Sequence, residues 1–543
     1  MRKLLFISLA ALMVQGCFKS EEADVIIHNA NIITLNTQEP KAQAVAIKNG
    51  KIIQVGAERE ILNKYAAKQT IDVQGKFVYP GFVDAHCHFL GLGQTLQQVN
   101  LQGVESLDAF AEKVKTFAKT NPEGWVFGRG WDESLWTDQT KPTAQFLDEL
   151  FPNRPVFLKR VDGHSAVANS LAMKMAGITQ QTKVQGGLVE VKNGLLTGIV
   201  VDEAMDLLDD AMPERTIAKD AKALMKAQQV CFSEGLTTVT DAGLNLKDII
   251  LIDSLQQADE LQMPMYVMAS DNDENKEYFF NRGKWITDLL TVASFKFYAD
   301  GSLGSRSARL KQHYHDHSHG GMMMNDKAYF QKQAELMKLH GFQMNTHCIG
   351  DSAVAMMLDV YANTLGGTND LRWRIEHAQV VDASDLNMFS LYSIIPSVQP
   401  THALSDRRWA KERLGDERIR GAYAYKDLLA TNGVLAFGTD FPVETVSPLR
   451  TFFAAVFRKE PGEKGEGWFV EQALSRQEAL KAMTIGAAIA NKQDSLYGSI
   501  EVGKLANFTI LNTDLLKDPE DRLANTKVLK TIVHGEVVFE QIK

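Results

Sequence analysis

The stretch Val83-Asp84-Ala85-His86-Cys87-His88, which follows Tyr79-Pro80-Gly81, decides the fold predicted for this chain. It has the character of a buried strand. Because successive side chains of a strand point to opposite faces, His86 and His88 point the same way, with Asp84 on their side. Neutral imidazole is a preferred ligand of zinc and related transition metals. The stretch therefore predicts half of a metal site, with an incidental pair of histidines as the alternative.

Seven further strands are predicted downstream of this stretch, and helical segments lie between most of them. The seven apolar runs cover residues 236–241, 265–268, 294–298, 343–347, 373–377, 394–398 and 435–440. Helical spacing is clear in residues 327–340 and 477–490. Together with the first stretch this makes eight strand–helix units. Such an alternation predicts an α/β fold built on a parallel (β/α)8 TIM barrel.

Both ends of the chain look like short strands joined by tight turns. Within residues 24–80, Asn49-Gly50 separates two β-branched runs, which is a strong hairpin signal. Residues 498–543 contain similar runs. Neither end is large enough to bury a core alone, so we expect the two to pair into one small composite β-sandwich. The barrel domain then covers residues 81–497, with an α+β insertion at about 90–225, after barrel strand 1.

The first residues are typical of a targeting segment. A positive start precedes the apolar run Leu4 to Val14, which is too short to span a bilayer and fits a signal peptide. The following Val14-Gln15-Gly16-Cys17 resembles the processing box of bacterial lipoproteins. That resemblance implies a signal peptide at 1–16, lipidation of Cys17 and a linker at 17–23. We expect a lipoprotein anchored in the bacterial cell envelope, facing the periplasm or the outer surface, with secretion and an unmodified or removed Cys17 as the alternative.

The composition excludes several classes of protein. A chain of 543 residues with 45% hydrophobic and 23% charged residues is typical of a globular catalytic domain with attachments. The net charge of -9 and the pI near 5.9 argue against nucleic-acid binding, which needs a basic surface. The three cysteines beyond Cys17 are too few for a disulfide framework. Alternation turns Cys87 and Cys348 away from the adjacent histidines, as small buried hydrophobic residues.

The unusual residues of the predicted barrel fall at the same ends of its strands. In a TIM barrel the carboxyl ends of the strands form the functional mouth. A lone buried histidine is more often a core residue than a ligand, but a buried lysine is costly unless it is paired or modified. Six such residues at one mouth indicate a metal site. They are His86, His88, Lys296, His347, His377 and Asp440.

Five motifs carry these residues and make a resemblance to a known family visible. They are Asp84-Ala85-His86-Cys87-His88, the run from Lys296 to Ser305, the run from Thr346 to Asp351, Ile375-Glu376-His377-Ala378-Gln379 and Gly438-Thr439-Asp440-Phe441-Pro442. As a set they resemble the metal-dependent amidohydrolase superfamily. The branch they resemble most is amidohydrolase family 3, which contains N-substituted formamide deformylases. The resemblance runs from about residue 24 to the C-terminus.

The resemblance implies a ligand set for one or two divalent ions, with zinc expected. His86, His88 and Asp440 would hold the more buried ion. His347 and His377 would hold a second ion, and Lys296 would be carboxylated and bridge the two. The alternative for Lys296 is an ion pair with Asp300 or Glu376, with a single ion or a different bridge.

The expected reaction is hydrolysis of a non-peptide amide C–N bond, of the N-substituted formamide or N-acyl amine type. A metal-activated hydroxide would attack the carbonyl, and Asp440 would act as general base. Two alternatives stay open. One is hydrolysis of a lactone or cyclic imide, or an isomerisation, on the same site. The other is a lipid-anchored protein that binds a metal or ligand without catalysis.

Residues outside the ligand set are expected to shape the substrate pocket. Trp131, Asp162 and His164 lie in insertion segments that also resemble the family and are expected to reach over the barrel mouth. His164 is a candidate catalytic donor to the substrate carbonyl, with a hydrogen-bonded loop residue as the alternative. Arg306 is expected to contact an anionic substrate or to pair with surface acids. Phe441 would line an aromatic pocket.

The expected partners are a small-molecule amide substrate and, through lipid on Cys17, a membrane. Nucleic acid is not an expected partner. The oligomeric state stays open, a homodimer included, as do the metal and the substrate.

Overall fold

The computed structural model describes residues 20–137, 139–161 and 164–542. The proposed signal peptide at 1–16, the lipidation site Cys17 and the pocket candidate Asp162 therefore lie outside the described residues. Among the residues that are described, no helix is both long enough and apolar enough to cross a membrane.

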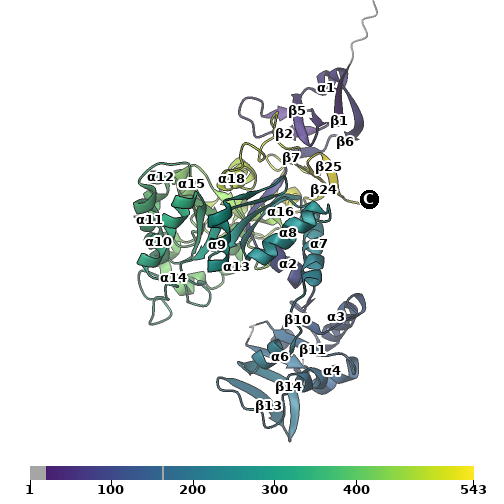
Figure 1. The fold of residues 1–543 in the computed structure, drawn as a ribbon, viewed down its shortest axis with the longest axis vertical. Helices are drawn as coiled ribbons and strands as arrows, with labels where there is room; N and C mark the ends of the chain where they lie inside the picture. Colours follow the sequence, from purple (N-terminus) through teal and green to yellow (C-terminus); the bar gives the residue numbers. More distant parts are fainter. Residues whose placement is uncertain (1–19, 138, 162–163, 543) are drawn as a thin grey trace, which may run out of the picture.

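The central sheet is a parallel eight-stranded barrel, as the sequence predicted (Figure 1). Its strands are neighbours in chain order, which is the arrangement that strand–helix repeats produce. In that order they are β8 (Phe82–Cys87), β15 (Leu236–Leu244), β16 (Met265–Ser270), β18 (Leu290–Tyr298), β19 (Gln343–Cys348), β20 (Arg374–His377), β21 (Ile395–Val398) and β22 (Ala436–Phe437).

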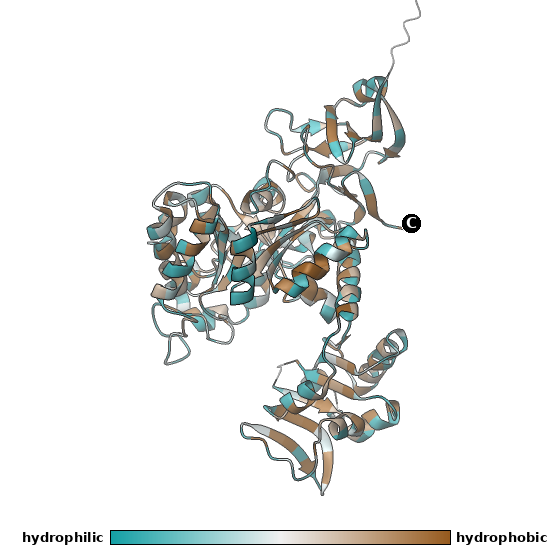
Figure 2. Cartoon of the chain, in the orientation of Figure 1, coloured by the Kyte–Doolittle hydropathy of each residue, from teal (hydrophilic) through white to brown (hydrophobic). Residues whose placement is uncertain are grey.

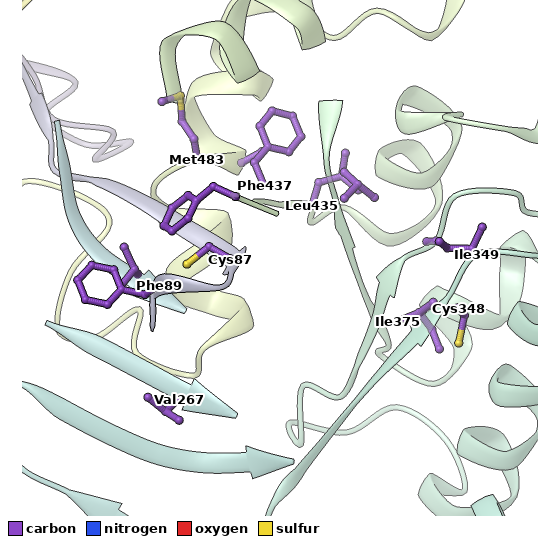
Figure 3. Packing of buried hydrophobic residues seen from close by; sticks show 14 of the residues in the cluster. Cys87, Phe89, Val267, Cys348, Ile349, Ile375, Leu435, Phe437 and Met483 are labelled. Carbon is purple, nitrogen blue, oxygen red and sulfur yellow. The ribbon is translucent and has the colours of Figure 1, made fainter. Parts of the chain in front are cut away.

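Helices between the strands and after the last strand surround the barrel. They include α2 (Phe89–Thr95), α7 (Ile217–Ser233), α8 (Leu246–Gln257), α9 (Asp273–Arg282), α10 (Lys327–His340), α11 (Asp351–Leu365), α12 (Leu386–Leu391), α13 (Pro400–Asp406), α14 (Ala410–Arg418), α15 (Tyr425–Asn432), α16 (Pro448–Phe457), α17 (Arg476–Ala482) and α18 (Ile485–Ala490). Figure 2 shows the barrel strands as mostly apolar, with polar residues gathered on the surrounding helices and loops. Figure 3 shows Cys87 and Cys348 within the buried apolar cluster between strands and helices. Both cysteines have no exposed surface.

The barrel closes where the chain after β22 passes β8. Asp440 N donates to His86 O at 2.8 Å, and His88 N donates to Phe441 O at 2.8 Å. The buried Asp84 carboxylate ties the two segments together, because it accepts from Thr439 Oγ1 at 2.7 Å and from His86 N at 3.1 Å. The closure therefore places His86, His88 and Asp440 side by side.

Gly438 makes this closure sterically possible. A Cβ atom at this position would lie 2.6 Å from both His86 N and His86 O, closer than real Cβ contacts occur. We expect Gly438→Ala to lower the free energy of unfolding by about 1–3 kcal/mol, because the backbone of strand 8 must move away from strand 1. Urea unfolding of the purified variant measures this. A free energy unchanged within about 0.5 kcal/mol would contradict the tight closure.

Strands from both ends of the chain form a pair of sheets beside the barrel (Figure 1). One sheet has the order β5 (Lys51–Gly56), β4 (Ala44–Lys48), β1 (Glu21–His28), β6 (Tyr65–Asp72). The other has the order β25 (Glu536–Glu540), β24 (Val528–Val533), β23 (Phe508–Leu511), β7 (Phe77–Pro80), β2 (Asn31–Ile33), β3 (Lys41–Ala42). A shared apolar cluster contains Ile27, Ile47, Phe508 and Ile532. Strand β7, which pairs with β23, leads directly into barrel strand β8.

The segment after β8 and α2 forms a separate α+β unit that stands apart from the barrel (Figure 1). Its sheet has the order β13 (Gly187–Lys192), β14 (Leu195–Asp202), β12 (Ser165–Ala168), β11 (Val156–Arg160), β10 (Val126–Trp131), β9 (Val99–Asn100). Its helices are α3 (Leu107–Thr120), α4 (Ala144–Leu150), α5 (Ser170–Met175) and α6 (Asp206–Ala211). At the junction with α7, Gln97 Nε2 donates to Lys219 O at 2.7 Å. The unit has apolar clusters of its own.

Candidate metal centre

The six residues that the sequence placed at the strand ends line one cavity at the barrel mouth. Its volume is about 360 Å³, which is within the usual range for a small-molecule site. The polar residues of the lining are His86, His88, Lys296, Ser302, His347, His377, Gln379, His402, Ser405, Asp406, Asp440 and Glu444. The apolar and aromatic part of the wall consists of Tyr298, Leu303, Ile349, Trp409 and Val443.

His86, His88 and Asp440 form the first group of converging metal donors. Their ligand atoms all lie within 4.8 Å of one another. Asp440 Oδ1 is 3.5 Å from His86 Nε2 and 3.1 Å from His88 Nε2. In the described part of the chain, no donor meets this buried oxygen with hydrogen-bond geometry. Two imidazole nitrogens and an unsatisfied carboxylate oxygen fit a divalent ion such as zinc.

The charge state of Asp440 suits the same role. Burial by itself raises the pKa of a carboxyl group, but the neighbouring imidazoles of His88, His86 and His377 hold the pKa of Asp440 well below its usual range. The carboxylate is thus ionised at neutral pH and can act as a ligand or as a proton acceptor.

His86 is oriented by a buried chain of charges. Its Nδ1 lies 2.5 Å from Glu376 Oε2, and Glu376 Oε1 lies 3.2 Å from Arg374 Nε. A carboxylate only accepts, so Nδ1 carries the proton and Nε2 keeps its lone pair for a metal. Burial opposes ionisation, but Arg374 and His86 lower the pKa of Glu376 to about 2.

Lys296 lies on β18 with its amine among these groups. Its Nζ is 3.1 Å from His86 Nε2. Burial lowers the pKa of Lys296, against the pull of Glu376 and Asp440. Asp300, one of its two alternative partners, instead accepts hydrogen bonds from the backbone N–H groups of Arg309 at 2.8 Å and Gly350 at 2.8 Å. The environment therefore favours the neutral amine, which is the form that reacts with carbon dioxide.

A second group of converging donors includes a residue that the sequence analysis missed. The ligand atoms of His377, His402 and Asp440 also lie within 4.8 Å of one another. His402 follows β21. No site residue was predicted on this strand, nor on the strands predicted at 236–241 and 265–268. Its signal was available in Pro400-Thr401-His402, directly after the apolar run at 394–398. It lies in the first turn of α13, and not on the strand.

Two of the donors have backbone conformations that are rare for residues other than glycine. His377 has φ 70° and Asp440 has φ 60°. Such left-handed positions each cost of order 1–3 kcal/mol and concentrate at functional sites. Here they turn both side chains into the cavity at the point where each strand ends.

His347 lines the cavity but stands outside both donor groups. Its ring centroid is 4.5 Å from that of His377. Its Nε2 lies 3.2 Å from Gly301 O, a carbonyl that can only accept a hydrogen bond, so Nε2 carries the proton and Nδ1 keeps the lone pair that a metal needs. Burial is the main cause that lowers the pKa of His347 to about 3, so the ring is neutral.

The structure does not bring the four other candidates that it describes to this cavity. Trp131 is buried in the insertion, where its indole N–H donates to Leu158 O at 2.9 Å. His164 is on the surface of the insertion, with Nδ1 2.9 Å from Asp202 Oδ1. Arg306 pairs with Asp316 through two contacts of 3.1 and 2.7 Å. Phe441 is fully buried in the core behind the mouth.

These placements have physical reasons. The indole of Trp131 finds its acceptor inside the insertion, and Arg306 follows the surface-pairing alternative. The aromatic residues that line the cavity are instead Trp409 and Tyr298, and the Tyr298 ring lies beside His347, with centroids 5.5 Å apart.

Comparison with known proteins adds an independent line of evidence. Residues 69–539 match the model of the amidohydrolase family. The chain is 33% identical to Protein LONG AFTER FAR-RED 3 of Arabidopsis thaliana, over 95% of this chain and 92% of that protein. It is 27% identical to the N-substituted formamide deformylase of Arthrobacter pascens, over 95% of this chain and 98% of that protein. An uncharacterized metal-dependent hydrolase from Pyrococcus furiosus superposes with a TM-score of 0.76 at 29% identity, covering 91% of this chain and 100% of that one.

Proposed function

This chain belongs to the amidohydrolase family, and from that premise we propose that it hydrolyses a non-peptide amide C–N bond of the N-substituted formamide or N-acyl amine type. The observation that carries the proposal is the buried group of His86, His88 and Asp440, whose donor atoms converge at the barrel mouth. The similarity to an N-substituted formamide deformylase supports the choice of an amide. The chain is a metal-dependent hydrolase, and the amide class is the proposed refinement.

The residues present fit a divalent ion, and nitrogen and oxygen donors in this combination favour zinc. A bound ion would act as a Lewis acid toward the substrate carbonyl and would make water a better nucleophile at neutral pH. His86 and His88 would hold it with Asp440. Glu376 keeps His86 in the tautomer that offers Nε2.

Asp440 is the proposed proton carrier of the reaction. In the hydrolysis, water adds its oxygen to the carbonyl carbon, the C–N bond breaks, and the amine leaves with a proton. The ionised Asp440 carboxylate accepts the proton from water and returns it to the leaving nitrogen. Asp440 lies at the end of strand 8, lines the cavity and is 7% exposed, which supports this role.

Carboxylation of Lys296 is part of the same proposal. Its support is the buried amine beside His86, with a pKa lowered by desolvation. A carbamate would replace a costly buried cation with an anionic oxygen donor.

The wall of the cavity supports a substrate with an apolar group. Leu303, Ile349 and Val443 offer aliphatic contacts, and Trp409 offers an aromatic face. An alkyl or aryl substituent on the amide fits this wall better than a charged one.

A substrate panel tests the proposal. Zinc-loaded protein is offered N-alkyl and N-aryl formamides, N-acetyl amines, lactones and cyclic imides, and the released acid and amine are quantified together. We expect at least one amide to be hydrolysed with kcat/KM above about 10⁴ M⁻¹s⁻¹, giving acid and amine in equal amounts. Hydrolysis of lactones or cyclic imides, without hydrolysis of any amide, would contradict the proposal and favour the alternative chemistry on this site.

A further inference from the structure

Gln379 lines the cavity with a side-chain amide that is fixed by hydrogen bonds. It lies two residues after the end of β20 and is 5% exposed. Its Nε2 donates to Tyr423 Oη at 2.8 Å and to Asp406 Oδ2 at 3.4 Å. A backbone hydrogen bond joins the same two loops, because Tyr423 N donates to Gln379 O at 2.8 Å. The amide group is therefore held in one orientation.

The sequence of donors and acceptors decides which end of this amide remains free. Tyr423 Oη donates its single proton to Asp406 Oδ2 at 2.8 Å, since a carboxylate only accepts. Burial and the Asp406 carboxylate raise the pKa of Tyr423 well above its usual range, so the phenol keeps that proton. The phenol oxygen can then only accept from Gln379, and the atom of Gln379 that contacts it is the amide nitrogen. The oxygen, Oε1, is therefore the free end.

We propose that Gln379 Oε1 accepts the N–H of the scissile amide, so that the protein selects secondary amides over tertiary ones. The inference deepens the proposed function and rests on it. Within the described ranges of the chain, no donor meets Oε1, and the two amide protons of Gln379 are directed at Tyr423 and Asp406. The residue thus offers the cavity an acceptor and no donor. The partner it suits is the single N–H of a secondary amide, which a tertiary amide or a lactone lacks.

The burial of Gln379 sets the size of the selectivity. When a substrate covers this wall, an acceptor without a donor loses its contact with water and gains nothing in exchange, which weakens binding by roughly 10–100-fold. A site built to hydrogen-bond a substrate N–H therefore rejects the analogue that lacks it. Tyr423 and Asp406 are the positioning residues, because their hydrogen bonds keep the amide from turning its nitrogen toward the substrate.

The test compares the best secondary amide of the substrate panel with the same compound carrying an N-methyl group, on zinc-loaded protein. We expect kcat/KM of the unmodified protein to be about 10–100-fold higher for the secondary amide. Gln379→Met keeps the size of the side chain and removes the acceptor. It is expected to lower kcat/KM for the secondary amide by about the same factor and to change that for the tertiary amide less than about threefold. Gln180→Met, at an exposed position of the insertion, is the matched control and is expected to change neither.

Two outcomes would overturn the inference and leave the proposed function standing. One is hydrolysis of both amides by the unmodified protein with equal kcat/KM, and the other is a preference for the secondary amide that Gln379→Met retains. If Gln379→Met fails to fold, Tyr423→Phe decides, because it removes the hydroxyl that orients the amide and keeps the buried ring. The preference is expected to fall at least about threefold in that variant, and an unchanged preference refutes the inference. If the protein hydrolyses no amide of the panel, the proposed function fails, and this inference fails with it.

Discussion

Asp440→Ala is expected to lower kcat/KM for the amide substrate by at least about 10³-fold. The carboxylate is at once a donor to the first ion and the proposed proton carrier, and loss of a positioned general base alone costs typically 10²–10⁴-fold. Asp440 is buried and ionised, and its Oδ1 lies 3.1 Å from His88 Nε2 and 3.5 Å from His86 Nε2. No other described carboxylate has this combination. Steady-state kinetics on the best amide of the panel measures the loss.

The matched control for this variant is Asp273→Ala. Asp273 is a fully exposed carboxylate on α9, outside the cavity. We expect it to change kcat/KM by less than about twofold, as surface substitutions usually do. If the Asp440→Ala variant kept more than about one tenth of the amide-hydrolysing activity, the role of Asp440 as base would be contradicted.

Glu376→Ala is expected to lower the free energy of unfolding of metal-free protein by about 3–5 kcal/mol. Arg374, Glu376 and His86 all have side chains with no exposed surface. Without Glu376 the Arg374 guanidinium keeps its charge in the interior and loses its carboxylate partner, and His86 loses the acceptor for Nδ1. Urea unfolding in the presence of a chelator, followed by tryptophan fluorescence, measures this without a contribution from bound metal.

Glu335→Ala is the control for the buried charge chain. Glu335 is exposed on α10, and its removal is expected to change the free energy by less than about 0.5 kcal/mol. A loss for Glu376→Ala that is no larger than that of the control would show that the chain of Arg374, Glu376 and His86 does not stabilise the barrel.

The barrel was predictable because each of its strands is a short buried run followed by a helix. The run at 343–347 and the one at 373–377, for example, correspond to β19 and β20 within one residue at each end. The prediction was least accurate for strand 8. The run at 435–440 is a regular strand only at Ala436–Phe437, because Gly438 must approach His86 and Asp440 turns into a left-handed conformation.

The site was only partly predictable, and the reason differs from residue to residue. His86, His88 and Asp440 converge because the ends of strands 1 and 8 are neighbours in any closed barrel. His402 was missed because it lies in the helix after its strand, where alternation gives no information about direction. Trp131 was expected at the mouth because its segment resembles the family, but its place depends on how the insertion packs. That packing is a tertiary property, and the indole is satisfied by Leu158 inside the insertion.

We propose that a metal held at the ends of strands 1 and 8 makes this chain an amide hydrolase. The most direct measurement removes the metal with a chelator, titrates zinc back, and records amide hydrolysis against zinc bound per chain. We expect no hydrolysis by the metal-free protein, recovery in proportion to bound zinc, and no recovery in Asp440→Ala. Full amide hydrolysis by protein that contains no metal would contradict it.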